Sequence, residues 1–127
     1  MARILIVDDE EMDRVLLAEF LQRAGHDPLF APNGEAALRI WKRGKVDLVV
    51  TDIVMPGLNG LELLEALKEE DPWVRVIAIS GISAKKLNEA ARSGALAILT
   101  KPIDPEELAR EIDKALKGTG SWMDVEG

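Results

Sequence analysis

A chain of 127 residues has the usual length of one domain, and it can bury about two thirds of its unfolded surface. Its hydrophobic content of 47% and charged content of 31% exclude a disordered chain. The net charge of −7, from 16 basic and 23 acidic residues, argues against nonspecific binding to nucleic acid or to an anionic membrane. The absence of cysteine excludes disulfides and thiolate chemistry.

In chain order, short apolar runs alternate with longer helical patterns. The runs occupy residues 3–7, 27–31, 46–51, 74–80 and 95–100. Several are rich in valine and isoleucine and are too short to be helices, which is typical of buried strands. Helical spacing of apolar residues occurs over 10–24, from Gly34 to near Gly44, over 61–71, over 83–94 and in a segment that begins at Pro105.

Two of these helices have recognisable ends. Gly25 suits the position just after the first helix, where a left-handed backbone is common. Asp104 is expected to cap the last helix, with Pro105 in the first helical position and Glu107 completing an Asp-x-x-Glu capping box. Five strands alternating with five helices imply right-handed crossovers and a parallel sheet covered on both faces. The predicted fold is a doubly wound α/β domain.

Charged and hydroxyl side chains follow these strands at the carboxyl edge, where open parallel sheets bind their ligands. They are Asp8, Asp9, Asp52, Ser80 and Lys101. Converging carboxylates repel one another unless a cation is present, and an all-oxygen ligand set suits Mg²⁺. A carboxylate beside such a metal can attack phosphorus to form an acyl phosphate. Lys101 would then neutralise charge, and Ser80 would hydrogen-bond a phosphoryl oxygen.

Four sequence blocks resemble those of bacterial response-regulator receiver domains. The blocks are "ILIVDDE", "LVVTDIVMPGLNGLELL", "VIAISG" and "LTKP", in the order found in that family. The similarity covers residues 2 to about 117, and four blocks at four strand ends are far more specific than any single one. The resemblance implies a flavodoxin-like sheet of five parallel strands in the order 2-1-3-4-5 with five helices.

The resemblance also implies a role for each residue. Asp52 matches the phosphoacceptor, which takes its phosphoryl group from a sensor histidine kinase or a histidine phosphotransfer protein. Asp9 matches the direct metal carboxylate, Asp8 its mostly water-mediated neighbour, and the backbone carbonyl of Val54 a further ligand. With Asp52 itself, these residues would hold Mg²⁺. Ser80 matches the switch hydroxyl.

The last block carries one match and one departure. Lys101 matches the conserved lysine of the family, and the Pro102 peptide bond after it is expected to be cis. Ile98 stands at the second switch position, where receivers typically carry tyrosine or phenylalanine. We therefore expect the signal to depend on a shift of the loop after Ser80, with altered coupling at Ile98. The signalling face would combine the segments 83–94 and 95–100 with the last helix.

Three other interpretations compete with this one. Taken alone, Asp8 and Asp9 fit an N-terminal helix cap equally well. An Mg²⁺-dependent phosphohydrolase of similar topology would carry a second acid two residues after its nucleophile, where this chain has Val54. A flavodoxin-type electron carrier would need a glycine- and hydroxyl-rich phosphate loop after the first strand, and "DDEEMDR" is its electrostatic opposite.

The expected organisation is a receiver domain over 1–118 and a tail over 119–127, with no output domain. The domain would catalyse only its own phosphorylation and dephosphorylation, and it would not be an enzyme in the turnover sense. Its partners would be the histidine donor and an unknown output protein, with no contact to nucleic acid or membrane. No basic leader is present and no apolar stretch approaches the ~18 residues of a membrane span, so the expected compartment is the cytoplasm.

Overall fold

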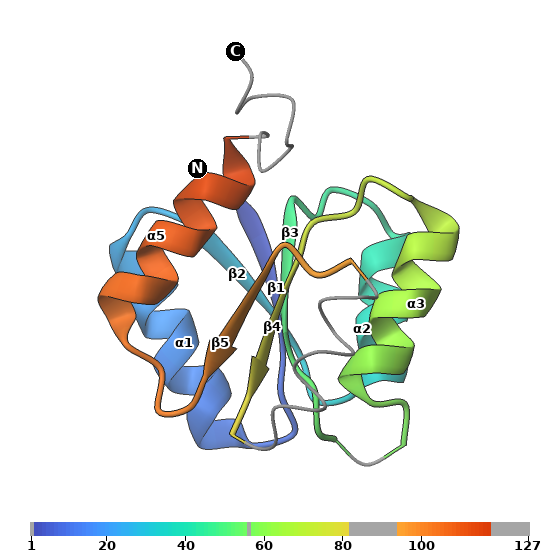
Figure 1. The fold of residues 1–127 in the computed structure, drawn as a ribbon, viewed down its shortest axis with the longest axis horizontal. Coiled ribbons are helices and arrows are strands. Elements are labelled where there is room, and N and C mark those ends of the chain that lie inside the picture. Colours follow the sequence, from blue (N-terminus) through green and yellow to red (C-terminus); the bar gives the residue numbers. More distant parts are fainter. Residues whose placement is uncertain (1, 56, 82–93, 118–127) are drawn as a thin grey trace.

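The computed structural model describes residues 2–55, 57–81 and 94–117, and these contain a five-stranded sheet in the order β2-β1-β3-β4-β5. The strands are β1 (Arg3–Val7), β2 (Asp27–Ala31), β3 (Leu48–Asp52), β4 (Val76–Ser80) and β5 (Ala97–Thr100). Every neighbouring pair is parallel, so all five carboxyl ends lie along one edge, the lower edge in Figure 1. The predicted sheet and its strand order are confirmed.

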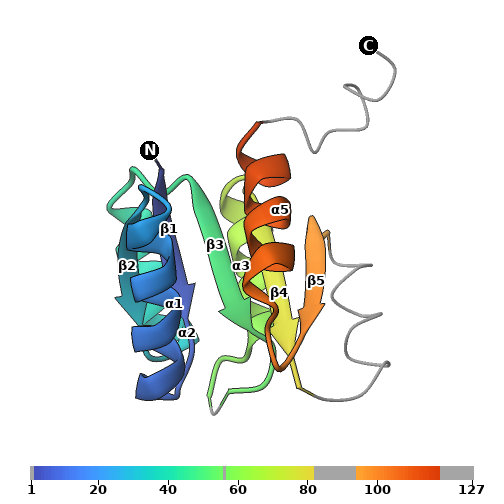
Figure 2. The same ribbon diagram turned by 90° about the vertical axis from the view of Figure 1, so that its left-hand side faces the viewer.

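Helices cover both faces of the sheet. They are α1 (Glu11–Arg23), α2 (Gly34–Lys42), α3 (Gly60–Glu70) and α5 (Pro105–Leu116). Helices α1 and α5 lie on one face, and α2 and α3 lie on the other (Figures 1 and 2). The described part of the chain thus shows four helices, and the helix predicted over 83–94 lies outside it apart from Gly94. None of the helices in the described ranges has the length and apolar character needed to cross a bilayer.

The side chains of β1 explain why the run "ILIV" is apolar throughout. Ile4 and Ile6 point into the core beneath α1 and α5, while Leu5 and Val7 point into the core beneath α2 and α3. All four are at most 1% exposed. Because successive side chains of a strand alternate between faces, a strand covered on both sides needs an unbroken apolar run. The run ends at the sheet edge, where the next residue meets the site.

The observed helix ends agree in part with those predicted from the sequence. Gly25 adopts φ +88°, and its amide donates to Gln22 at 3.0 Å, as expected for a glycine that ends a helix. Asp104 does cap α5, but its carboxylate accepts from the Glu106 amide at 3.0 Å. The predicted N-cap at Asp104 is thus confirmed, but the predicted capping box with Glu107 is wrong.

Helix α3 begins directly against the end of β3. The Asn59 side chain and Glu62 form a capping box there, which the sequence analysis missed. The Gly60 amide donates to the carbonyl of Ile53 at 2.9 Å, and a Cβ atom at Gly60 would overlap the Asp52 carbonyl oxygen. Glycine is required at this position because the helix and the strand end approach so closely.

Candidate functional site

The carboxylates predicted at the strand ends do converge. Asp8, directly after β1, is 3% exposed, and Asp52, the last residue of β3, is 7% exposed. Asp9 is exposed beside them. One oxygen from each of the three lies within 4.8 Å of the others. This set of hard oxygen ligands fits a small divalent cation such as Mg²⁺.

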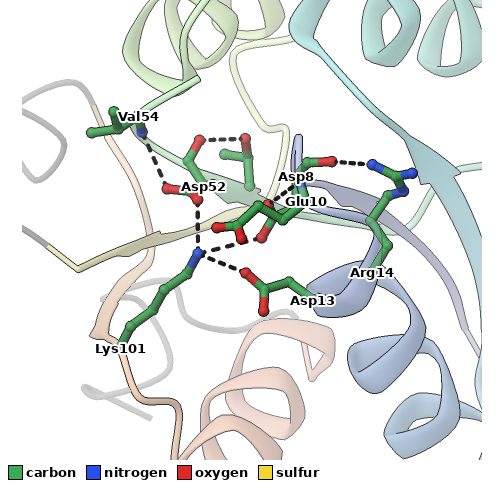
Figure 3. Close-up of polar contacts among 8 residues, drawn as sticks. Asp8, Glu10, Asp13, Arg14, Asp52, Val54 and Lys101 are labelled. Atoms are coloured by element: carbon green, nitrogen blue, oxygen red, sulfur yellow. Dashed lines mark hydrogen bonds and ion pairs between the residues drawn. The ribbon is translucent and has the colours of Figure 1, made fainter. Parts of the chain in front are cut away.

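Lys101, directly after β5, brings one positive charge into this group (Figure 3). Its Nζ atom donates to Asp52 Oδ2 at 2.9 Å, to Asp13 Oδ2 at 3.1 Å and to Asp8 Oδ2 at 3.5 Å. The Lys101 side chain is 26% exposed, so these contacts are screened less than surface ion pairs. Three carboxylates therefore share one ammonium group.

Backbone groups fix the two buried carboxylates. Asp8 Oδ1 accepts from the Glu10 amide at 2.9 Å, and the Arg14 guanidinium donates to the Asp8 carbonyl at 2.7 Å. Asp52 Oδ1 accepts from the Val54 amide at 3.1 Å. In each carboxylate, one oxygen is held by a local amide and the other faces Lys101. The orientation of both acids thus follows from the turns at the ends of their strands.

Burial and neighbouring charges shift the pKa values of Asp8 and Lys101. Burial raises the pKa of Asp8, and the nearby carboxylates of Asp52 and Asp13 raise it further, against the lowering effect of the Glu10 amide and of Lys101. Burial alone would lower the pKa of Lys101, but its hydrogen bonds to Asp52 and Asp13 raise it above the usual lysine value. Lys101 is therefore a permanent cation at neutral pH.

The two predicted switch residues lie in different surroundings. Ser80 is fully buried at the end of β4, and its carbonyl accepts from the Lys101 amide at 3.0 Å, so it lies at the same edge as the acids. Ile98 lies within β5 opposite Ala78 and packs with Ile53 in a small apolar cluster. The structure thus places Ser80 at the site edge and Ile98 in the neighbouring core.

Asp13 is a member of the site that the sequence analysis missed. It lies in the first turn of α1, 88 residues before Lys101 in sequence. A signal was present, because Asp13 is spaced four residues before Leu17 and eight before Leu21, which both pack in the core. A carboxylate on the inward side of a helix needs a partner, and Lys101 is that partner.

Comparison with known proteins agrees with this geometry. The family model described as the response regulator receiver domain matches residues 4–113. The chain belongs to the response-regulator receiver family. Receiver domains are signalling switches of two-component systems and not conventional enzymes, and they bind Mg²⁺ at an acidic pocket. The peptide bond between Lys101 and Pro102 is cis, as expected from the family resemblance.

Individual relatives match this receiver chain over most of its length. It is 36% identical to sporulation initiation phosphotransferase F of Bacillus subtilis, over 90% of this chain and 93% of that protein. It is 38% identical to the transcriptional regulator NtrC of Azospirillum brasilense, over 91% of this chain but only 24% of that protein. The response regulator TrrA of Thermotoga maritima, solved in complex with Mg²⁺ and BeF, superposes with a TM-score of 0.85 at 35% identity, covering 91% of this chain and 100% of TrrA.

Proposed function

We propose that this receiver domain is a phosphorylation-activated switch that accepts a phosphoryl group on Asp52 from a sensor histidine kinase or a histidine phosphotransfer protein. The observation that carries this proposal is the position of the Asp52 carboxylate at the carboxyl edge of the sheet, 2.9 Å from the Lys101 ammonium. A nucleophilic carboxylate beside a fixed cation is the arrangement that aspartyl phosphate formation needs.

In the transfer step, one oxygen of Asp52 attacks the phosphorus atom of the donor's phosphohistidine. A new O–P bond forms while the P–N bond breaks, and the imidazole leaves with the electron pair of that bond. Lys101 remains protonated and neutralises charge on the phosphoryl oxygens, because its pKa is raised above the usual lysine value. The Val54 amide holds Asp52 Oδ1 at 3.1 Å and so limits rotation of the nucleophile.

Mg²⁺ would be held by Asp8, Asp9 and Asp52 together with the backbone carbonyl of Val54. The clustering of one oxygen from each aspartate within 4.8 Å supports this assignment. When bound, the metal supplies positive charge that stabilises the transferring phosphoryl group. Arg14 contributes indirectly, because its bond to the Asp8 carbonyl holds the start of the loop that carries Asp8 and Asp9.

Ser80 and Ile98 would convert phosphorylation into a change of shape. The Ser80 hydroxyl is assigned to bind a phosphoryl oxygen, and Ile98 would respond through its apolar contacts with Ile53 and Ala78. The signalling face would include β5 and α5 together with the segment 83–94, which lies outside the described residues. An output protein would bind this face.

The histidine donor would dock on α1 beside the site. Met12, Val15 and Leu16 are 71%, 53% and 59% exposed, which is unusual for large apolar side chains on one helix. A groove of about 410 Å³ lies between Leu16 on this helix and the start of α5, and it also exposes Asp8 and Lys101. A donor helix seated there would bring its phosphohistidine to the carboxyl edge of the sheet.

The proposed switch is a single receiver domain that acts in the cytoplasm. We assign residues 1–118 to the receiver domain and residues 119–127 to a tail; residues 118–127 lie outside the described part of the chain. The domain would act in the cytoplasm, where histidine kinases use ATP to generate phosphohistidine. We expect no direct contact with nucleic acid or membrane, because the chain carries a net charge of −7.

The test is intact mass measurement after incubation with phosphoramidate and Mg²⁺. We expect one base-labile phosphoryl adduct, absent after chelation of the metal and absent in Asp52→Asn. Asp113→Asn, which removes an exposed carboxylate on α5, serves as the matched control and should be modified like the parent. An adduct that persists in Asp52→Asn would contradict the assignment of the phosphoacceptor.

A further inference from the structure

The Lys101 ammonium has three N–H donors, and three carboxylates share them. Asp8 and Asp52 come from the edge of the sheet, while Asp13 comes from the first turn of α1 (Figure 3). The distance from Lys101 Nζ to Asp13 is 3.1 Å, close to the 2.9 Å to Asp52 and shorter than the 3.5 Å to Asp8. Asp13 is therefore a principal partner of the ammonium group.

The three carboxylates differ in how easily they can lose this cation. The side chains of Asp8 and Asp52 are 4% and 9% exposed, while that of Asp13 is 33% exposed. A buried carboxylate deprived of its cation is strongly destabilised, whereas a partly exposed one can be solvated by water. Asp13 is thus the partner that Lys101 can give up at the lowest cost.

A phosphoryl group on Asp52 brings new acceptor oxygens to an ammonium whose donors are already occupied. From this geometry we infer that Asp13 is a positioning residue, which holds Lys101 in the unphosphorylated domain and competes with the incoming phosphoryl group for it. The inference rests on the proposed phosphorylation of Asp52. Because Asp8 and Asp52 still hold Lys101 when Asp13 is absent, loss of Asp13 removes the competitor without freeing the lysine. Asp13 therefore restrains phosphorylation.

The first test compares Asp13→Asn with the parent in the initial rate of phosphorylation by phosphoramidate at saturating Mg²⁺. We expect the variant to react roughly three- to tenfold faster, the effect of removing one partly exposed charge-assisted hydrogen bond. Asp13→Glu keeps the charge and should return the rate to near the parent value. The affinity for beryllofluoride, a stable mimic of the phosphoryl group, should rise by a similar factor in Asp13→Asn.

Glu11→Gln is the matched control for loss of charge. Glu11 is an exposed acid in the same first turn of α1, and its side chain forms no ion pair within the described ranges. We expect its rate to change less than about twofold, because its charge is screened by solvent. Equal acceleration by Glu11→Gln and Asp13→Asn would show a general field effect and would overturn the inference.

A double-variant cycle tests whether Asp13 acts through Lys101. In a Lys101→Met background, Asp13→Asn should no longer tighten beryllofluoride binding, because the shared ammonium is gone. The same gain in both backgrounds would contradict the inference. If the parent gains no phosphoryl group on Asp52, the proposed function itself fails. If the parent is phosphorylated and Asp13→Asn reacts at the same rate, only the role of Asp13 fails.

Discussion

The two ends of β1 both carry charged residues, but they use them differently. At the amino end, the Arg3 guanidinium meets Asp27 at 3.2 Å with both side chains nearly half exposed, and the Arg3 amide donates to Asp47 at 2.8 Å. At the carboxyl end, Asp8 and Asp52 are buried and share Lys101 with Asp13. The charged residues at the amino end form ion pairs and hydrogen bonds that are exposed to water. At the carboxyl end, several acids are gathered in a site that is largely shielded from water.

We expect this difference to make the carboxyl end the less stable of the two, because it gathers the acids of the proposed phosphorylation site. Exposed ion pairs such as Arg3–Asp27 contribute little, because water and salt screen them. Buried carboxylates around a single ammonium repel one another, and this repulsion is relieved only when a further cation or a change of protonation intervenes. Substitutions at the two ends should therefore change the free energy of unfolding by different amounts. At the carboxyl end, some substitutions should lower it and others should raise it.

The largest difference in stability is expected between alanine variants of two glycines. Gly60→Ala should lower the free energy of unfolding by about 3 kcal/mol, because its Cβ would overlap the Asp52 carbonyl oxygen and the Ile53 Cα. Gly44→Ala, near the amino end of β3, should cost only about 1 kcal/mol, since it adopts φ +87° but has open space around it. Urea unfolding followed by tryptophan fluorescence measures both. Equal losses would show that close packing at the site edge is not what requires glycine.

The next effect concerns the shared ammonium. In the presence of EDTA, Lys101→Met should lower the free energy of unfolding by about 2 kcal/mol, because it leaves buried carboxylates without a counter-charge. Added Mg²⁺ should restore part of that loss. The control is Lys117→Met, which breaks an exposed pair of 3.0 Å with Asp113 and should cost less than about 0.5 kcal/mol. If the two variants lose the same stability, the acids at the carboxyl edge do not depend on Lys101.

The sequence predicted the strands, and the meeting of most candidate site residues at one edge, because these features follow from local patterns. The buried runs end where Asp8, Asp52 and Lys101 begin, and a parallel topology then brings these ends to one edge. Strand starts were less predictable. The third, fourth and fifth strands begin two residues later than expected, because Val46, Val74 and Ala95 are apolar residues of loops that pack against the core beneath α2 and α3. Apolar character alone does not distinguish a strand from a covered loop.

The inward position of Asp13 could be read from its helical spacing, but its partner, Lys101, could not be predicted from the sequence. Their contact joins residues 88 positions apart, and it depends on how α1 is rotated about its axis relative to the sheet. The predicted capping box of α5 was wrong at a finer level, because the Asp104 carboxylate accepts from the Glu106 amide and not from the Glu107 amide. Contacts that depend on the exact position of a side chain can be identified only in the three-dimensional structure. The arrangement of the strand ends along one edge can be predicted from the sequence.

A stabilising variant is expected at Asp8. Burial raises the pKa of this carboxyl, so the folded domain holds the proton more tightly than the unfolded chain does. Ionisation therefore costs stability; this cost is absent below the unfolded pKa, grows as the pH rises from the unfolded to the folded pKa, and is constant above the folded pKa. In EDTA at pH 7, Asp8→Asn should raise the free energy of unfolding by about 1 kcal/mol, and the gain should vanish near pH 3. A gain that does not depend on pH would show that the charge of Asp8 is not its source.

The smallest effect is expected at the amino end. Arg3→Met removes the exposed pair with Asp27 but leaves the hydrogen bond from the residue 3 amide to Asp47, since that bond uses the backbone. The free energy of unfolding should fall by less than about 0.5 kcal/mol, and a double-variant cycle with Asp27→Asn measures the pair itself. A coupling above about 1 kcal/mol would mean that half-exposed charges on β1 stabilise the fold as strongly as buried ones. The contrast between the two ends would then reflect the number of acids gathered at the site and not their burial.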